Sequence, residues 1–276
     1  PHLLVMSATP IPRTLALIAY GDLDVSVIGE LPPGRRPVET FLVSEALRER
    51  LNGFIRRQCS EGHQVYVVCP AVEESEDGGL RSAEAWAQTL QQSVFPDLRV
   101  GLLHGKMKSA EKDAALAAFS AGETDILVAT TVVEVGVDVP NATLMVIENA
   151  ERFGLSQLHQ LRGRVGRGQA QSYCVLVSST KNEETKKRLQ ALCKTTDGFK
   201  IAEQDLALRG PGDFFGSRQH GLPLLKVASL QMDLETLRDA QQAAAAVIQT
   251  ADSLNAPELA PLKARVEALF TRQEVS

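Results

Sequence analysis

Five short apolar runs, separated by helix-length segments, constrain the fold of this chain more than any other feature of its sequence. Each run is rich in β-branched residues and mostly apolar along its length, whereas a half-exposed strand would alternate apolar and polar residues. Strands of this kind are typical of a parallel sheet covered by helices on both faces. The pattern predicts an α/β fold with a doubly wound parallel sheet, with ligands expected beyond the carboxyl ends of the strands. The runs lie at 64–69, 98–103, 125–130, 143–147 and 172–178.

Helical spacing of apolar residues fills the intervals between these runs. We predict Ser44 as the N-cap of the first helix, and Trp86 in the second as a core anchor instead of a stacking platform. Residues 208–216 should be irregular, because two glycines there flank a proline. The predicted helices lie at 47–59, 82–93, 109–119, 156–164, 185–193 and 229–248, and a short last helix follows Pro257 and Pro261.

The composition limits the class of protein. Hydrophobic residues make up 44% of the chain and charged residues 23%, so it should fold around a sizeable core. The net charge of −5 weakly favours a metabolic enzyme over a nucleic-acid-binding protein. No apolar run reaches the roughly 18–20 residues that span a bilayer, so we expect no membrane partner. The four cysteines and five histidines are dispersed, which predicts reduced structural thiols in the cytoplasm and no metal site.

Three arginines interleaved with three glycines form the strongest chemical signal. A guanidinium group can bind phosphate oxygens through two parallel hydrogen bonds and keeps its charge, so this segment is suited to a polyphosphate. A solvated basic turn is the alternative. The arginines are Arg162, Arg164 and Arg167, and the glycines are Gly163, Gly166 and Gly168.

A second signal follows the run at 125–130. Thr130 and Thr131 end that run, and Gly136 and Asp138 come within the next eight residues. Hydroxyl groups and backbone N–H groups at such a position suit phosphate oxygens. An ordinary cap of the strand would look the same, so the segment alone leaves both readings open.

Two weaker segments also follow apolar runs. His104 and Lys106 come directly after one of them, and Ser7 and Thr9 lie in a small polar turn after another. Lys106 does not complete a phosphate-binding P-loop, because the glycine and hydroxyl that the motif requires are missing. The sequence has no dinucleotide-binding fingerprint either. Because it has no P-loop, the chain alone should not hydrolyse ATP.

Taken in order, the four segments resemble the motifs in the C-terminal half of a superfamily 2 helicase motor. Each segment alone is weak, but four in this order are specific. Residues 7–9 resemble motif III, 103–108 the motif IVa region, 129–140 motif V and 160–167 motif VI.

The resemblance narrows to the RecG family of bacterial branch-migration helicases. Residues 23–28, 31–35 and 134–142 look like that family. Residues 197–212 resemble the TRG motif, a helical hairpin and loop that RecG shares with the transcription-repair coupling factor Mfd. Mfd is the nearest alternative, although it would continue into a further regulatory domain for which this chain has little room.

The resemblance implies a domain organisation. Residues 1–37 would be a remnant of the first motor lobe, since the chain begins without Met inside an apolar run. Residues 38–180 would form the second RecA-like lobe, and 181–276 a mostly helical region with the TRG hairpin, a loop and a tail. A wedge domain and the first lobe with its P-loop would lie upstream. Residues 1–37 would then lack their native cover and pack poorly.

It also implies roles for individual residues. Arg164 and Arg167 would be arginine fingers that reach ATP, with Gln160, Gly136 and Asp138 at the nucleotide interface. The DNA backbone would be contacted by His104, Lys106, Thr130 and Thr131, and coupling of hydrolysis to DNA movement would involve Ser7, Thr9, Arg188, Arg209 and Gln219.

The function that the resemblance implies is the C-terminal motor portion of an ATP-dependent double-stranded DNA helicase. Its substrates would be branched DNA, such as stalled replication forks and Holliday junctions, in recombination and repair. ATP with Mg²⁺ would be bound mainly by the first lobe, and the protein would act as a monomer in the bacterial cytoplasm, at the nucleoid. Bulk acidity does not exclude this function, because basic residues cluster at 159–167 and at 186–188.

Two other classes stay open. One is a nucleotide-binding metabolic enzyme whose arginines hold a phosphorylated substrate. The other is an interaction module whose helix at 229–248 docks onto a partner, although an apolar stripe on such a helix is more often part of a core.

Overall fold

The structure is a computed structural model, and it describes Leu4, Met6 and residues 35–70, 83–130, 138–209, 234–249 and 253–271. The described residues divide into two compact units. The first contains Leu4, Met6 and residues 35–205 within those ranges, and the second contains residues 206–209, 234–249 and 253–271. The domain boundaries at 37/38 and 180/181 stay predictions.

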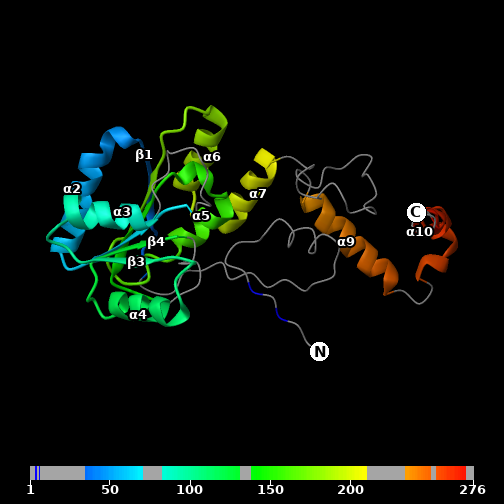
Figure 1. Ribbon diagram of the computed structural model, residues 1–276. Helices are drawn as coiled ribbons and strands as arrows, with labels where there is room; N and C mark the ends of the chain where they lie inside the picture. The colour runs from blue at the N-terminus through cyan, green and yellow to red at the C-terminus, as the bar shows by residue number, and fades with distance from the viewer. Residues whose placement is uncertain are drawn as a thin grey trace. The chain divides into compact units, whose positions relative to one another are not determined.

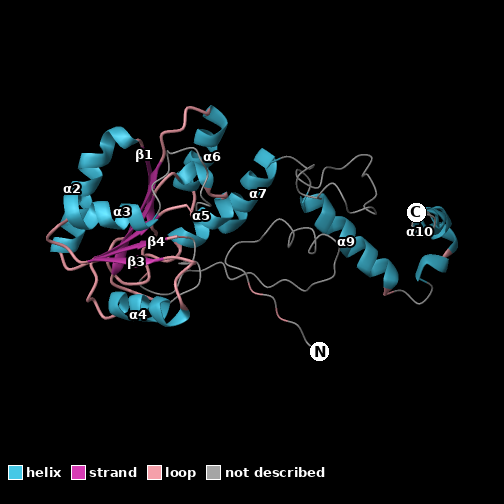
Figure 2. Ribbon diagram, in the orientation of Figure 1, coloured by secondary structure: helices cyan, strands magenta, loops and turns pink. Residues whose placement is uncertain are grey.

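The first unit is built on a parallel sheet whose strands run side by side (Figure 2). Among the described residues the strand order is β1-β6-β5-β2-β4-β3, and every pair is parallel. This confirms the doubly wound α/β fold. The strands are β1 (Glu39–Val43), β2 (Gln64–Val68), β3 (Val100–Leu103), β4 (Ile126–Ala129), β5 (Ala142–Ile147) and β6 (Tyr173–Val177).

Helices cover both faces of this sheet (Figure 1). The helices α2 and α3 pack on one face, and α4, α5 and α6 pack on the other, as right-handed crossovers between parallel strands require. The helices are α2 (Arg48–Ser60), α3 (Ala83–Thr89), α4 (Ser109–Ser120), α5 (Leu155–Arg162), α6 (Glu183–Lys194) and α7 (Gly198–Arg209), with a π-helical turn η2 (Leu90–Val94) and two 3-10 turns, η1 (Glu45–Leu47) and η4 (Ala150–Arg152).

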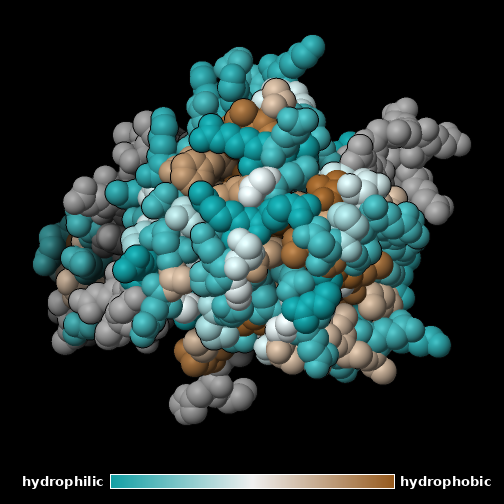
Figure 3. All heavy atoms as spheres, turned by 90° about the vertical axis from the view of Figure 1, so that its left-hand side faces the viewer, coloured by the Kyte–Doolittle hydropathy of each residue, from teal (hydrophilic) through white to brown (hydrophobic). Residues whose placement is uncertain are grey.

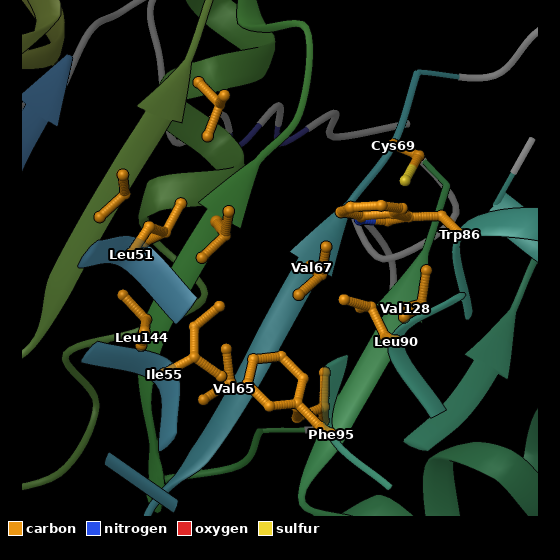
Figure 4. Packing of buried hydrophobic residues seen from close by; sticks show 14 of the residues in the cluster. Leu51, Ile55, Val65, Val67, Cys69, Trp86, Leu90, Phe95, Val128 and Leu144 are labelled. Carbon is orange, nitrogen blue, oxygen red and sulfur yellow. The ribbon is translucent and has the colours of Figure 1, made fainter. Parts of the chain in front are cut away.

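The core under α2 and α3 is a continuous cluster of buried side chains. Leu51 and Ile55 of α2 and Trp86 of α3 lie over the central strands, where Val65 and Val67 project (Figure 4). Trp86 is only 6% exposed, so the prediction that it anchors the core is confirmed.

The opposite face has its own core. Phe119 of α4 packs on Tyr66 of β2, with ring centroids 4.7 Å apart. Leu158 of α5 and Leu189 of α6 are fully buried. Both faces of the central strands are thus buried, which explains why the sequences of these strands are apolar along their length.

The structure corrects three expectations. The segment Glu39–Val43 forms the edge strand β1, which the sequence pattern did not single out. Ser44 makes no capping hydrogen bond with its side chain, because the chain enters a 3-10 turn at Glu45 before α2 begins. Finally, α7 continues through Arg209, so the irregular stretch cannot begin at Leu208.

All four cysteines are free thiols. Burial raises the pKa of Cys69 and Cys174 to about 12, so neither thiol is ionised near neutral pH. Both therefore behave as small core residues, in line with the prediction of structural thiols.

The second unit is helical in its described parts. It contains α9 (Leu234–Ile248), α10 (Ala260–Thr271) and the 3-10 turns η5 (Ser253–Asn255) and η6 (Pro257–Leu259). Lys263 Nζ donates to Asn255 Oδ1 at 2.8 Å and ties α10 to η5. The predicted helix at 229–248 is confirmed over its described part, 234–248, and the predicted last helix begins at Ala260, one residue before Pro261. Among the helices that the structure describes, none is both long and apolar enough to cross a bilayer.

The surface is mainly hydrophilic on the side of α2, where apolar side chains form smaller patches between polar ones (Figure 3). Outside the two units' helices and strands, Leu4 and Met6 are each 82% exposed. Other residues before Arg35 lie outside the described part, so the packing of residues 1–37 is described only at Leu4, at Met6 and at 35–37.

Candidate functional site

The predicted site residues lie at the two opposite ends of the parallel strands, which we call the carboxyl edge and the amino edge of the sheet. His104 and Thr130 directly follow β3 and β4, so they lie at the carboxyl edge. Asp138 shortly precedes β5, and Arg167 shortly precedes β6, so these two lie at the amino edge. The arginine segment therefore lies at the end of the sheet opposite the carboxyl ends, beyond which ligands were expected.

A tight turn holds the residues at the carboxyl edge. The Thr130 backbone N–H donates to the carbonyl of the last residue of β3 at 3.1 Å, which places Thr130 beside His104. The Met107 N–H donates to the His104 carbonyl at 3.2 Å, and the turn that this bond closes carries the exposed Lys106. His104 Nε2 lies 3.2 Å from Glu84 Oε1 of α3. The structure thus brings His104, Lys106 and Thr130 together.

An ion pair joins the two segments at the amino edge. Arg167 Nη1 lies 3.2 Å from Asp138 Oδ1, and Arg167 Nε donates to the Gly163 carbonyl at 3.2 Å. The side chains are 28% and 59% exposed, and an ion pair this accessible contributes only about 0–1 kcal/mol. An anionic ligand can therefore replace the carboxylate at little cost in free energy.

Two glycines allow the loop between α5 and β6 to approach its neighbours. An added Cβ on Gly168 would lie 2.6 Å from the Pro140 carbonyl oxygen, so only glycine fits against the segment that carries Asp138. Gly166 has a φ of +75°, which favours glycine, and its carbonyl accepts a 2.7 Å hydrogen bond from Arg35 Nε. These two glycines of the arginine segment thus allow a close backbone contact and a left-handed turn that other residues would disfavour.

The charged groups at the amino edge affect the pKa of the buried Tyr66. Burial raises the pKa of Tyr66 to about 12; Arg164 and Arg167 act in the opposite direction, and Asp138 adds to the rise. All three charged groups therefore lie within electrostatic range of one strand, β2. Gln160 is half-buried on the last turn of α5 and precedes Arg164 and Arg167. Tyr66 was not predicted from sequence, because it reads as one more strand residue.

Arg162 differs from the other two arginines. It is 3% exposed, and its Nη1 donates to the carbonyls of Leu192 and Thr195 at 2.8 and 2.9 Å. Its Nη2 lies 2.8 Å from His159 Nδ1. The interpretation of three phosphate-binding arginines is therefore wrong for Arg162, whose donors bind within the protein.

His159 does not add positive charge to this segment. Burial and the neighbouring guanidinium of Arg162 lower the pKa of His159 to about 4, so the ring is neutral at pH 7. The basic cluster predicted at 159–167 is therefore limited to arginines, of which Arg164 and Arg167 lie outside the buried network.

The residues predicted to couple hydrolysis to DNA movement are only partly visible. Arg188 Nη2 of α6 donates to the Glu151 carbonyl at 2.7 Å. The Nε of Arg188 and Oε2 of Glu151 are buried and have no partner among the residues that the structure describes. Arg209 ends α7, and its side chain is not described. The other predicted site residues, Ser7, Thr9, Thr131, Gly136 and Gln219, lie outside the described residues.

A buried ion pair at the carboxyl edge was missed. Arg48 Nη1 and Nη2 bind Glu148 Oε1 and Oε2 at 2.6 and 2.7 Å, and the Arg48 guanidinium lies 5.3 Å from the centroid of the Trp86 ring. A carboxylate directly after a buried strand was the available signal. Because the Arg48 guanidinium of α2 binds Glu148 as well as Glu45, the pair fastens this helix to the sheet.

Comparison with known proteins agrees with this geometry. Residues 45–169 match the family model of the helicase conserved C-terminal domain. Residues 195–274 match the model of the C-terminal part of domain 3 of the ATP-dependent DNA helicase RecG. The first match contains the predicted site residues at the carboxyl edge and at the amino edge, and the second match begins directly after α6.

Curated relatives are RecG helicases from several bacteria. The chain is 55% identical to the ATP-dependent DNA helicase RecG of Synechocystis over 260 residues, which cover 94% of this chain and 31% of the relative. The RecG of Bacillus subtilis is 48% identical over 95% of this chain and 39% of the relative. The RecG of Escherichia coli K12 is 53% identical over 88% and 35%. The chain thus spans about a third of the length of these relatives.

A solved structure of RecG bound to a three-way DNA junction is similar in fold and sequence. It superposes with a TM-score of 0.66 at 50% identity, over 85% of this chain and 30% of that one. Together with the two family models, these matches show that the chain belongs to the RecG family of ATP-dependent DNA helicases, with which it shares the helicase C-terminal lobe and the C-terminal part of domain 3.

Proposed function

We propose that this chain supplies the second motor lobe and the coupling region of a helicase that remodels branched double-stranded DNA. The observation that carries the proposal is the pairing of Arg167 with Asp138, which joins the segments resembling motifs V and VI. The RecG relative bound to a three-way junction supports branched DNA as the substrate class. Replication forks and Holliday junctions are the proposed substrates within that class.

ATP would be shared between this lobe and a first lobe that carries the P-loop. The residues at the amino edge fit a triphosphate, because an arginine has planar donors and, among the described residues, Arg167 binds an exposed carboxylate and one carbonyl. Mg²⁺ would be bound with ATP by the first lobe. ATP with its metal supplies the phosphoryl group that is transferred to water.

The chemistry of this lobe is charge stabilisation. Arg167 would exchange the Asp138 carboxylate for a phosphate oxygen, and Arg164 would approach beside it. Asp138, released from the pair, and Gln160 would then be free to accept or donate hydrogen bonds at the nucleotide. An arginine supplied across an interface contributes about 10³–10⁵ in rate to related phosphoryl transfers, so closure of the lobes would control hydrolysis.

DNA would be held at the other edge. His104, Lys106 and Thr130 lie together there, and Thr131 would extend this set. Lysine, hydroxyl and backbone N–H groups contact phosphates without reading bases, which suits a protein that moves along any sequence. Ser7, Thr9, Arg188, Arg209 and Gln219 are the proposed coupling residues.

Two further points belong to the proposal. The match of residues 195–274 to RecG domain 3 favours this function over the corresponding part of Mfd, and no observation favours a metabolic enzyme. We propose that the protein works as a monomer in the bacterial cytoplasm, and that this chain, which has no P-loop, is inactive without the first lobe.

The test is Arg167→Ala in the full-length protein. We expect kcat of the fork-stimulated ATPase to fall at least about 100-fold, since an arginine finger contributes about 10³–10⁵, while fork binding at fixed salt stays within about threefold. Arg50→Ala, which removes an exposed arginine of α2 on the other face of the sheet, is the control and should change neither quantity. Retention of ATPase in the Arg167 variant would remove the basis for the proposal.

A further inference from the structure

Arg162 is the most deeply buried charged residue of the arginine segment. It is the last residue of α5, two positions before Arg164, and is 3% exposed. Its guanidinium makes three short hydrogen bonds, to the carbonyls of Leu192 and Thr195 and to His159 Nδ1, at 2.8, 2.9 and 2.8 Å. A longer contact of 3.5 Å reaches Thr40 Oγ1 of β1.

These acceptors belong to the end of another helix. Leu192 lies in the last turn of α6, and Thr195 is its C-terminal cap residue. The last carbonyls of a helix have no partner within the helix and carry the negative end of its dipole. The guanidinium of Arg162 therefore satisfies two such carbonyls and places a positive charge where the helix favours one.

The arrangement depends on the shape of arginine as well as its charge. The planar guanidinium reaches acceptors in three directions: the end of α6, the ring of His159 and the start of β1. A lysine ammonium has a compact charge and cannot span these acceptors in the same fixed geometry. Arg162 thus fixes the end of α5 in both position and rotation.

The turn that follows α5 is bonded to the residues around Arg162. The Val165 N–H donates to the Arg162 carbonyl at 3.3 Å, and the Arg164 N–H donates to the Leu161 carbonyl at 2.9 Å. Arg167 Nε then donates to the Gly163 carbonyl. These hydrogen bonds therefore tie the end of α5 to the short turn that carries the half-buried Arg164 and Arg167.

We propose that Arg162 is a positioning residue for Arg164 and Arg167. It locks the end of α5 onto the end of α6 and so sets the direction in which the guanidinium groups of Arg164 and Arg167 point. This inference rests on the proposed function, in which those two arginines reach ATP. Misplacement of a reacting group by about 1 Å can lower a rate by about 100-fold, so loss of the lock should appear in catalysis.

The test uses the full-length protein with Arg162→Met and Arg162→Lys. We expect kcat of the fork-stimulated ATPase to fall about 10–100-fold in the methionine variant, with KM for ATP changed less than about threefold, because ATP is held mainly by the other lobe. The kcat of the lysine variant should lie between those of the parent and the methionine variant, since lysine keeps the charge but lacks the planar guanidinium. Circular dichroism at the assay temperature establishes that each variant is folded.

A double-mutant cycle separates positioning from general structural damage. In an Arg167→Ala background, Arg162→Met should lower kcat at most about threefold further, because the group that it positions is already gone. If the reductions in kcat caused by Arg162→Met and by Arg167→Ala multiply in the double variant, the inference is wrong. It is also wrong if folded Arg162→Met keeps the parent kcat. If Arg167→Ala itself keeps its ATPase, the proposed function fails instead.

A second variant covers the case in which Arg162→Met does not fold. His159→Leu removes one acceptor and leaves both α6 carbonyls in place, whereas His159→Gln keeps an acceptor near the same position. We expect His159→Leu to lower kcat severalfold and His159→Gln to restore most of it. Equal kcat values for the two variants and the parent would overturn the inference.

Discussion

The loop at the amino edge is held so tightly that one added methyl group should measurably destabilise the first unit. Gly166 has a φ of +75°, and an added Cβ would lie 2.7 Å from Val38 Cγ2. Gly122, after α4, has the same φ, but no atom lies within 4 Å of its added Cβ. The two glycines therefore differ in their surroundings and share their backbone conformation, which makes Gly122→Ala a matched control for Gly166→Ala.

The expected magnitudes follow from these two contributions. An alanine in the left-handed region costs about 1–2 kcal/mol, and both variants carry this cost. Overpacking adds about 1–3 kcal/mol where the neighbour cannot move away. Val38 is half-buried and can yield in part, so we expect Gly166→Ala to lose about 1–2 kcal/mol more than Gly122→Ala.

Urea unfolding of the chain, followed by far-UV circular dichroism, measures both free energies of unfolding. Adding Val38→Ala to each variant tests the cause, because the smaller side chain removes the contact at Gly166 and leaves Gly122 unaffected. The extra loss at Gly166 should then disappear. Equal losses for the two glycine variants, or an extra loss that Val38→Ala does not relieve, would refute the contact as its source.

Two other predictions concern stability. Glu148→Ala should lower the free energy of unfolding by about 1.5–3 kcal/mol, because it removes two charge-assisted hydrogen bonds from Arg48, which keeps Glu45 as a partner, whereas loss of the exposed carboxylate of Glu183 should cost less than about 0.5 kcal/mol; urea unfolding compares the two. Burial beside a guanidinium lowers the pKa of His159 to about 4, below the value of about 6.5 in an unfolded chain, so the unfolded state binds the proton first. Stability should therefore fall by about 1–2 kcal/mol, after allowance for solvent screening, as the pH drops from about 6.5 to 4, and His159→Gln should flatten that part of the curve measured by thermal unfolding.

Most of the sheet could be predicted because its strands are buried on both faces. A continuous run rich in β-branched residues, such as Gln64–Val68, favours a buried strand over other secondary structures. The helices between such runs keep the 3.6-residue period. The edge strand Glu39–Val43 lacks this signal, since it begins with Glu39 and Thr40 and leaves Phe41 47% exposed. Propensity and periodicity say little about a strand that is half in solvent.

Arg162 shows why the site was harder to predict than the fold. An arginine in a run of arginines and glycines reads as exposed, and only tertiary structure supplies the carbonyls that bury it. One signal was available: Arg162 lies seven residues after Leu155 and four after Leu158, on the buried face of α5. The pairing of Arg167 with Asp138, in contrast, depends on two loops that only the sheet order brings together.

The edge strand β1 also determines how the first unit responds to a pulling force. Its five residues pair in parallel with β6, from Glu39 opposite Tyr173 to Val43 opposite Val177. Tension on the chain upstream of Arg35 acts along β1, so it loads the hydrogen bonds of this ladder together, in shear, instead of opening them one at a time. The first unit should therefore resist a pull along this strand until the hydrogen bonds of the whole ladder break together.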